Sequence, residues 1–238
     1  MSLSENYASI QGRIEAACTR AGRAPSEVQL IWVSKTHPVS SLLEAHAAGA
    51  YLFGENRVQE VLEKFPLPGL HSGDTQNPQD YELHLIGSLQ RNKVRKVLPL
   101  CSAIHSVDSV ALWEALDRVS GELGIRRDIL LQVNTSREPA KSGLDPATLI
   151  ETLKTLPEAK NLNLIGLMTL GPVEGGEEAA RVCFRELASL LRDARVEVLG
   201  RYPRLAKLSM GMSGDFETAI EEGAHFVRVG TALFGTRS

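Results

Sequence analysis

The chain has 238 residues and is 43% hydrophobic, which is enough apolar material to bury a sizeable core. Its formal net charge of −3 argues against a nucleic-acid-binding protein or one that adheres to anionic membranes, because both classes usually carry a basic excess. A local basic cluster (Arg91, Lys93, Arg95, Lys96) is typical of a solvated helix face rather than a nucleic-acid patch.

Apolar runs and amphipathic segments alternate along the chain. A helix is predicted over 4–22, because Ile10, Ile14 and Ala17 share one face and Gly22 can end it. VQLIWVS (28–34) follows, a near-continuous apolar run typical of a buried parallel strand. Seven more strands are predicted at 50–54, 83–87, 102–108, 128–134, 162–171, 204–213 and 225–235, and helices at 40–48, 55–65, 91–101, 109–124, 146–156, 176–194 and 215–223.

Eight β/α units without a Gly/Ser-rich linker predict one α/β domain over 1–238, a closed (β/α)8 TIM barrel with an extra N-terminal helix. The alternative is a doubly wound open sheet. Such a sheet normally has a Gly-rich turn after its first strand, whereas this chain has SKTHPVS (34–40) there. The polar stretch 66–82 contains prolines and glycines and predicts a surface loop without an assigned function.

The cysteines and the N-terminal residues indicate in which cellular compartment the protein is expected. Cys18, Cys101 and Cys183 are far apart and lack the spacing of a zinc or redox motif, which predicts reduced thiols in a cytoplasmic protein. The first residues lack the features of a signal peptide, and no apolar run approaches the ~20 residues that cross a bilayer. We therefore expect no membrane partner.

Lys35 stands at the end of the first predicted strand. In a barrel, chemistry is carried by residues at the carboxyl ends of the strands. The neighbours of Lys35 are apolar, so desolvation would lower its pKa and leave a neutral amine able to form a Schiff base with a carbonyl. The alternative is a strand-end lysine whose ammonium extends to solvent.

The loops after the seventh and eighth predicted strands suggest a phosphate site. They contain Ser213, Gly214, Gly230 and Thr231, where small residues let backbone N–H groups approach an anion and the hydroxyls add donors. A short helix beginning near Thr231 would direct its positive end at the phosphate.

Arg228 lies within an apolar strand, where burying a guanidinium requires hydrogen-bond partners. One interpretation is a structural ion pair. The other is a hydrogen bond to a cofactor's ring nitrogen, which the permanently protonated arginine would hold unprotonated. An unprotonated pyridine is a weak electron sink and would limit carbanion chemistry.

Several motifs together resemble the YggS/PROSC family of pyridoxal phosphate homeostasis proteins. They are VSKT (33–36), FGENRVQE (53–60), HLIGSLQRNK (84–93), KSGL (141–144), GLMTL (166–170), SMGMSGD (209–215) and VRVGTALFG (227–235). The resemblance implies a barrel like the N-terminal domain of alanine racemase, with pyridoxal 5'-phosphate (PLP) as cofactor.

Carried over to this chain, the resemblance makes Lys35 the Schiff-base lysine. The implied cofactor-binding set is Lys35, Asn56, Met210, Ser213, Gly214, Arg228, Gly230 and Thr231. His84 and Lys141 match recurrent motif positions, and a core role for His84 stays open. Gly214 departs from the family, in which many members have a second aspartate there.

Three functions remain to be compared. The resemblance favours a PLP carrier without a dedicated substrate, which exchanges PLP by transimination, passes it to apo-enzymes and is a monomer. An amino-acid racemase of the same fold needs a second base besides Lys35. In alanine racemases that base comes from a C-terminal domain, for which we expect no counterpart here. A Schiff-base aldolase or phosphosugar enzyme would leave Arg228 unexplained.

Overall fold

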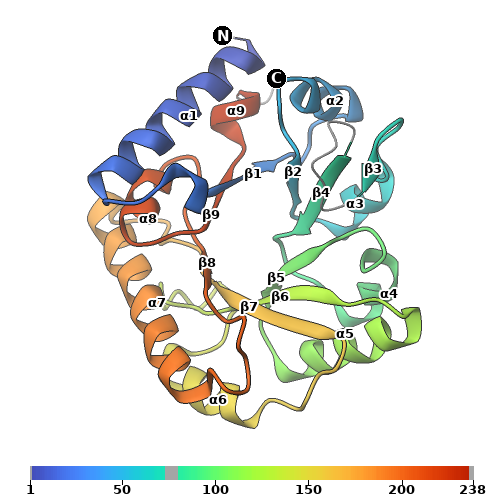
Figure 1. Ribbon diagram of the computed structural model, residues 1–238, viewed down its shortest axis with the longest axis vertical. Helices are drawn as coiled ribbons and strands as arrows, with labels where there is room; N and C mark the ends of the chain where they lie inside the picture. The colour runs from blue at the N-terminus through green and yellow to red at the C-terminus, as the bar shows by residue number, and fades with distance from the viewer. Residues whose placement is uncertain (1, 73–79, 236–238) are drawn as a thin grey trace.

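The structure is a computed structural model that describes residues 2–72 and 80–235. Eight parallel strands close into a ring in the order β1, β2, β4, β5, β6, β7, β8, β9, with β9 paired to β1. They are β1 Gln29–Val33, β2 Leu52–Glu55, β4 Asp80–Leu85, β5 Ala103–Val107, β6 Arg127–Gln132, β7 Leu162–Met168, β8 Lys207–Ser209 and β9 Phe226–Val229. Figure 1 shows the strands around the centre and the helices outside them. The predicted (β/α)8 barrel is confirmed.

The helices follow the predicted alternation, with ends displaced by a few residues. They are α1 Leu3–Arg20, α2 Val39–Ala47, α3 Val58–Lys64, α4 Val94–Val97, α5 Val110–Leu123, α6 Leu149–Thr155, α7 Gly176–Val198, α8 Phe216–Glu221 and α9 Thr231–Phe234, with 3-10 turns at Pro25–Glu27, Arg91–Lys93 and Pro146–Thr148. None of the helices formed by residues 2–72 and 80–235 combines the length and apolar character needed to span a membrane.

Two predicted segments each contain a kind of element other than the one that the sequence predicted for the segment. The segment 66–82 contains a short strand, β3 (His71–Ser72), and the first residues of β4; its residues 73–79 lie outside the described part of the chain. β3 forms by pairing with β4, and a polar sequence gives no local signal of such pairing. The predicted strand 225–235 ends at Val229, and its last residues form α9, so the short helix expected near Thr231 is confirmed.

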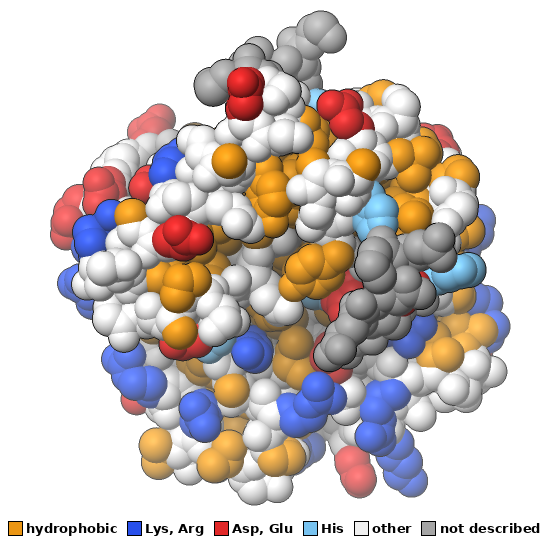
Figure 2. All heavy atoms as spheres, turned by 45° about the horizontal axis from the view of Figure 1, so that its top comes forward, with side chains coloured by type: hydrophobic (Ala, Val, Ile, Leu, Met, Phe, Trp, Pro, Cys, Tyr) orange, Lys and Arg blue, Asp and Glu red, His pale blue; other side chains and the backbone are white. Residues whose placement is uncertain are grey.

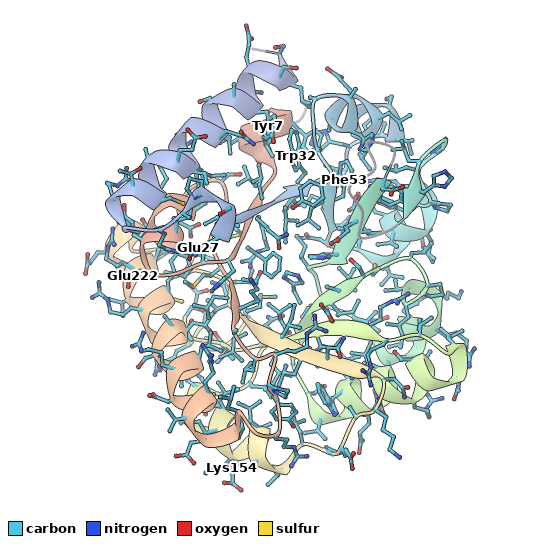
Figure 3. All side chains as sticks on the ribbon, viewed as in Figure 1. Tyr7, Glu27, Trp32, Phe53, Lys154 and Glu222 are labelled. Atoms are coloured by element: carbon cyan, nitrogen blue, oxygen red, sulfur yellow. The ribbon has the colours of Figure 1, made fainter. Side chains whose placement is uncertain are left out.

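The extra N-terminal helix covers the outside of the barrel beside β1 and β9, where α9 has only four residues. Tyr7 of α1 and Trp32 of β1 lie with their ring centroids 4.8 Å apart, and Figure 3 shows the two side chains next to each other. The Asn6 amide donates to the backbone carbonyl of Leu233 in α9 at 2.8 Å. Helix α1 therefore completes the outer layer of the barrel.

The interior of the barrel combines an apolar cluster with a buried polar group. The cluster contains Ile31, Val33, Leu52, Ile86, Leu130, Ile165, Met168 and Phe226. Four polar side chains are also buried inside, namely His84, His105, Ser209 and Arg228. Because the strands are parallel, their carboxyl ends meet at one mouth, and the residues that follow them form the site described below.

Candidate functional site

A cavity of about 230 Å³ lies at the mouth formed by the carboxyl ends of the strands. It is lined by Val33, Lys35, Asn56, Ile86, Leu170, Met212, Ser213, Gly214, Arg228, Gly230 and Thr231. The structure therefore brings together seven of the eight predicted cofactor-binding residues. A second hollow of about 610 Å³ shares Asn56, Ile86 and Leu170 with it, so the mouth is wide.

Lys35 is the second residue after the end of β1 and is partly buried. Within the described part of the chain its ammonium makes no hydrogen bond or ion pair, and it lines the cavity. The next residue, Thr36, has a φ of 67°, a left-handed conformation that is unfavourable for a β-branched residue. The backbone is thus strained at the point where it presents Lys35, and the lysine is left available for a ligand.

A buried polar network supports the Lys35 segment from behind. The Glu55 carboxylate accepts from the Ser34 hydroxyl at 2.8 Å and from the Lys64 ammonium at 2.9 Å. Burial raises the pKa of Glu55 above its ordinary value, although these donors oppose the shift. For Glu60, burial acts in the same direction but is outweighed by hydrogen bonds from Lys64 and from the backbone N–H of Thr36, so its pKa is lowered. The network fixes the backbone on both sides of Lys35.

Backbone N–H groups converge at the other side of the cavity. Those of Gly230 and Ala232 point at one oxygen, the Ser213 hydroxyl, at 3.3 and 3.5 Å. A Cβ on Gly230 would lie 3.0 Å from the Val33 carbonyl oxygen, so the glycine permits the close approach of β9 to β1. An oxygen that accepts from two N–H groups has the position that an anionic oxygen would take. Together with the Thr231 hydroxyl, these N–H groups form a donor set that could bind an anion.

The Arg228 guanidinium is 3% exposed and donates to the Ser209 hydroxyl at 2.7 Å and to the Thr169 carbonyl at 2.8 Å. No carboxylate of residues 2–72 or 80–235 forms an ion pair with it, so the structural ion pair considered from sequence is wrong. Burial lowers the pKa of Arg228 to about 10, with Asp215 opposing the shift, which leaves the group cationic at neutral pH. The cavity therefore contains a fixed cationic donor.

Asn56 provides a further sign that the cavity is built for a ligand. Its Oδ1 is buried and has no hydrogen-bond partner among residues 2–72 and 80–235, although buried acceptors are nearly always paired. The cavity thus presents an unpaired acceptor, a free amine, an N–H cradle and a cationic donor. These groups fit an aldehyde-bearing phosphorylated heterocycle such as PLP.

Met210 is the one predicted residue that the structure does not place at the cavity. It is fully buried in the core between barrel and helices, whereas Met212 lines the cavity. Sequence reasoning missed the four apolar lining residues Val33, Ile86, Leu170 and Met212. Apolar residues at strand ends have the same sequence pattern in a core and in a pocket, so no local signal distinguishes them.

The two residues with uncertain roles lie elsewhere. His84 is inside the barrel and bonded to His105 at 3.0 Å, which agrees with the core role. Lys141 lines the wider hollow, where it forms an ion pair with Glu138 and donates to the Gly171 carbonyl.

The closed barrel with this site defines a class of protein. Residues 6–238 match the family of the alanine racemase N-terminal domain, and the chain belongs to that family. Alanine racemase of Clostridium difficile shares the fold at a TM-score of 0.67 and 15% identity, with 99% of this chain and 56% of that chain covered.

Relatives with higher sequence identity define a smaller group within this family. The chain is 39% identical to the pyridoxal phosphate homeostasis protein of Aquifex aeolicus, over 100% of this chain and 99% of the relative. It is 38% identical to that of Escherichia coli K12, over 99% and 97%. The structure of PipY from Synechococcus elongatus with PLP bound aligns at a TM-score of 0.79 and 39% identity, covering 98% of this chain and 100% of PipY. Within the wider family, the chain belongs to the pyridoxal phosphate homeostasis proteins.

Proposed function

We propose that this protein holds PLP on Lys35 as a Schiff base and serves to keep PLP available in the cell, without a dedicated substrate. The observation that carries the proposal is the convergence of an unpaired Lys35 ammonium, an N–H cradle and a buried arginine on one cavity. The names of the full-length relatives and the PLP in the PipY structure support it.

Each group has a role that follows from its chemistry. Lys35 supplies the amine for the cofactor's aldehyde. Gly230, Thr231 and Ser213 donate to the phosphate, and Arg228 donates to the ring nitrogen. Because Arg228 stays protonated, it keeps that nitrogen unprotonated and restrains carbanion chemistry on bound PLP.

A racemase of the same fold is the second candidate. Racemisation needs a base on each face of the substrate. Among the described residues that line the cavity, Lys35 and Arg228 are the titratable ones; no Tyr, His, Asp, Glu or Cys is present. This lining favours the carrier.

The mechanism we propose for release is exchange, in which an incoming amine attacks the Schiff-base carbon and displaces Lys35. The wide mouth beside the cavity gives such an amine access. We further propose that the protein acts in the cytoplasm as a monomer and hands PLP directly to apo-enzymes.

Borohydride reduction followed by peptide mass mapping tests the central point. We expect a pyridoxyl adduct on the peptide that contains Lys35 and its loss in Lys35→Ala. Absence of an adduct at Lys35 in the wild-type protein would refute the proposal.

Two further assays test direct transfer of PLP and the choice between carrier and racemase. Holo-protein should reactivate a PLP-dependent apo-enzyme faster than it loses PLP spontaneously; equal rates would exclude direct transfer. Racemisation assays with several amino acids should give no turnover comparable with that of a dedicated racemase.

A further inference from the structure

Five side chains form a hydrogen-bonded chain through the barrel interior. The Arg228 guanidinium lies 2.7 Å from the Ser209 hydroxyl, which lies 2.9 Å from Nδ1 of His105. Nε2 of His105 is 3.0 Å from Nδ1 of His84, and Nε2 of His84 is 3.3 Å from a carboxylate oxygen of Glu82. The chain runs from β9 through β8 and β5 to β4, and its three middle members are at most 4% exposed.

The hydrogens of this chain have one consistent arrangement when both imidazoles are neutral. The Glu82 carboxylate can only accept, so His84 donates to it from Nε2 and accepts at Nδ1 from Nε2 of His105. Nδ1 of the neutral His105 then accepts from the Ser209 hydroxyl, whose oxygen accepts from the Arg228 guanidinium. Every donor points the same way, from the buried cation to the carboxylate.

The electrostatics of His105 agree with this arrangement. Burial lowers the pKa of His105 well below its ordinary value, and the neighbouring His84 and Arg228 add to the shift. The ring of Phe226, 5.2 Å from that of His105, covers it from β9. The imidazole at the middle of the chain therefore stays neutral, as the arrangement requires.

The two ends of the chain lie at opposite mouths of the barrel. Arg228 lines the cofactor cavity at the carboxyl ends of the strands. Glu82 and His84 line a separate hollow of about 350 Å³ at the amino ends, where the other charged lining residues are Asp128, Arg204 and Lys207. The hydrogen-bonded chain thus connects the cofactor cavity to the hollow at the amino ends of the strands.

We propose that Ser209, His105, His84 and Glu82 are positioning residues for Arg228, and that they couple the charge at the amino-end hollow to the ring nitrogen of the cofactor. The Ser209 hydroxyl and the Thr169 carbonyl each accept a hydrogen bond from the Arg228 guanidinium. These two bonds fix the orientation of the guanidinium and therefore the direction of its remaining N–H groups. Hydrogen bonds in a low-dielectric interior polarise one another, so a change at Glu82 alters the bond at Arg228. The last link, to the ring nitrogen, rests on the proposed function.

The first test needs no cofactor. Long-range ¹⁵N–¹H NMR of the protein prepared without PLP should show the ring hydrogens of His84 and His105 on Nε2. A hydrogen on Nδ1 of either ring at neutral pH would overturn the proposed chain, whatever the protein's affinity for PLP.

The second test compares two charge-removing variants at the same mouth. Glu82→Gln keeps an acceptor for His84 but removes the charge that ends the chain, whereas Asp128→Asn removes a charge of the same hollow outside the chain. We expect Glu82→Gln to shift the pH titration of the visible absorption band of bound PLP, and Asp128→Asn to leave it near that of the wild type. Equal shifts would indicate a general field effect and overturn the coupling, as would an unchanged titration in Glu82→Gln.

A third variant interrupts the chain near the cofactor. Ser209→Ala should raise the Kd for PLP roughly tenfold, because Arg228 loses a hydrogen-bond partner that orients it. Ser120→Ala is the control, since it removes a buried hydroxyl on α5 that has no hydrogen-bond partner in the described part of the chain. An unchanged Kd in Ser209→Ala would refute the positioning role. If the wild-type protein itself bound no PLP, the proposed function would fail, while the NMR result would still report on the chain.

Discussion

Ser213→Ala separates ligand binding from folding at the phosphate cradle. The Ser213 hydroxyl accepts from two N–H groups at 3.3 and 3.5 Å, which is beyond the usual range for a strong hydrogen bond. Its removal should therefore cost less than about 1 kcal/mol of unfolding free energy. With phosphate bound, the hydroxyl becomes a donor to a charged group, a bond that contributes about 1.5–3 kcal/mol. The Kd for PLP should therefore rise roughly 10- to 150-fold.

The assay is equilibrium dialysis with PLP and, separately, with pyridoxal, which lacks the phosphate. We expect the loss of affinity with PLP and almost none with pyridoxal, while thermal denaturation of the variant stays close to that of the wild type. An equal loss for both ligands, or a large fall in Tm, would show that Ser213 shapes the fold rather than the phosphate site. The same measurements on Ser120→Ala give the effect of deleting a buried hydroxyl elsewhere.

The remaining predictions concern backbone strain and pH. Gly211→Ala should lower the free energy of unfolding by roughly 2 kcal/mol or more in denaturant titration, because φ of Gly211 is 90° and an added Cβ would lie 2.5 Å from a side chain of α8. Gly214→Ala is the control, because a Cβ added there would have no atom within 4 Å. Thr36→Gly should not lower Tm, because glycine relieves the strain of the left-handed backbone at a cost of about 1 kcal/mol or less in backbone entropy. A clear fall in Tm would show that the backbone at Thr36 is not strained. Burial raises the pKa of Glu55 above 4.5, so its stabilising contribution is present below pH 4.5 and is lost as the pH rises through the pKa of the folded state. The pKa of Glu60 is lowered, so its stabilising contribution is present above pH 4.5 and is lost as the pH falls through the pKa of the folded state. Glu55→Gln and Glu60→Gln should therefore change the pH dependence of unfolding free energy in opposite directions, and parallel changes would refute the assignment.

Charged side chains of both signs reach the surface on the face shown in Figure 2. In this view Lys and Arg side chains lie mostly over the lower half, and Asp and Glu side chains mostly over the upper half. The expectation of no nucleic-acid partner therefore depends on the net charge of −3.

Much of the barrel was predictable because its signals are local. A buried parallel strand such as Gln29–Val33 reads as an apolar run, and an outer helix such as Leu3–Arg20 reads as a repeating apolar face. Strand ends were less predictable: the run 204–213 contains a strand of only three residues, Lys207–Ser209. Where pairing stops depends on the neighbouring strand, which the local sequence does not contain.

For the site, the sequence alone determined which groups could meet. Lys35, Ser213 and Arg228 follow or end strands, and parallel strands bring such positions to one mouth, so their convergence could be predicted from order along the chain. The tertiary structure decided what surrounds them. It placed Met210 in the core, left Asn56 Oδ1 unpaired, and gave Arg228 a hydroxyl and a carbonyl in place of a carboxylate. These outcomes depend on side chains from strands distant in sequence, because only closure of the barrel brings β4, β5, β8 and β9 around one axis.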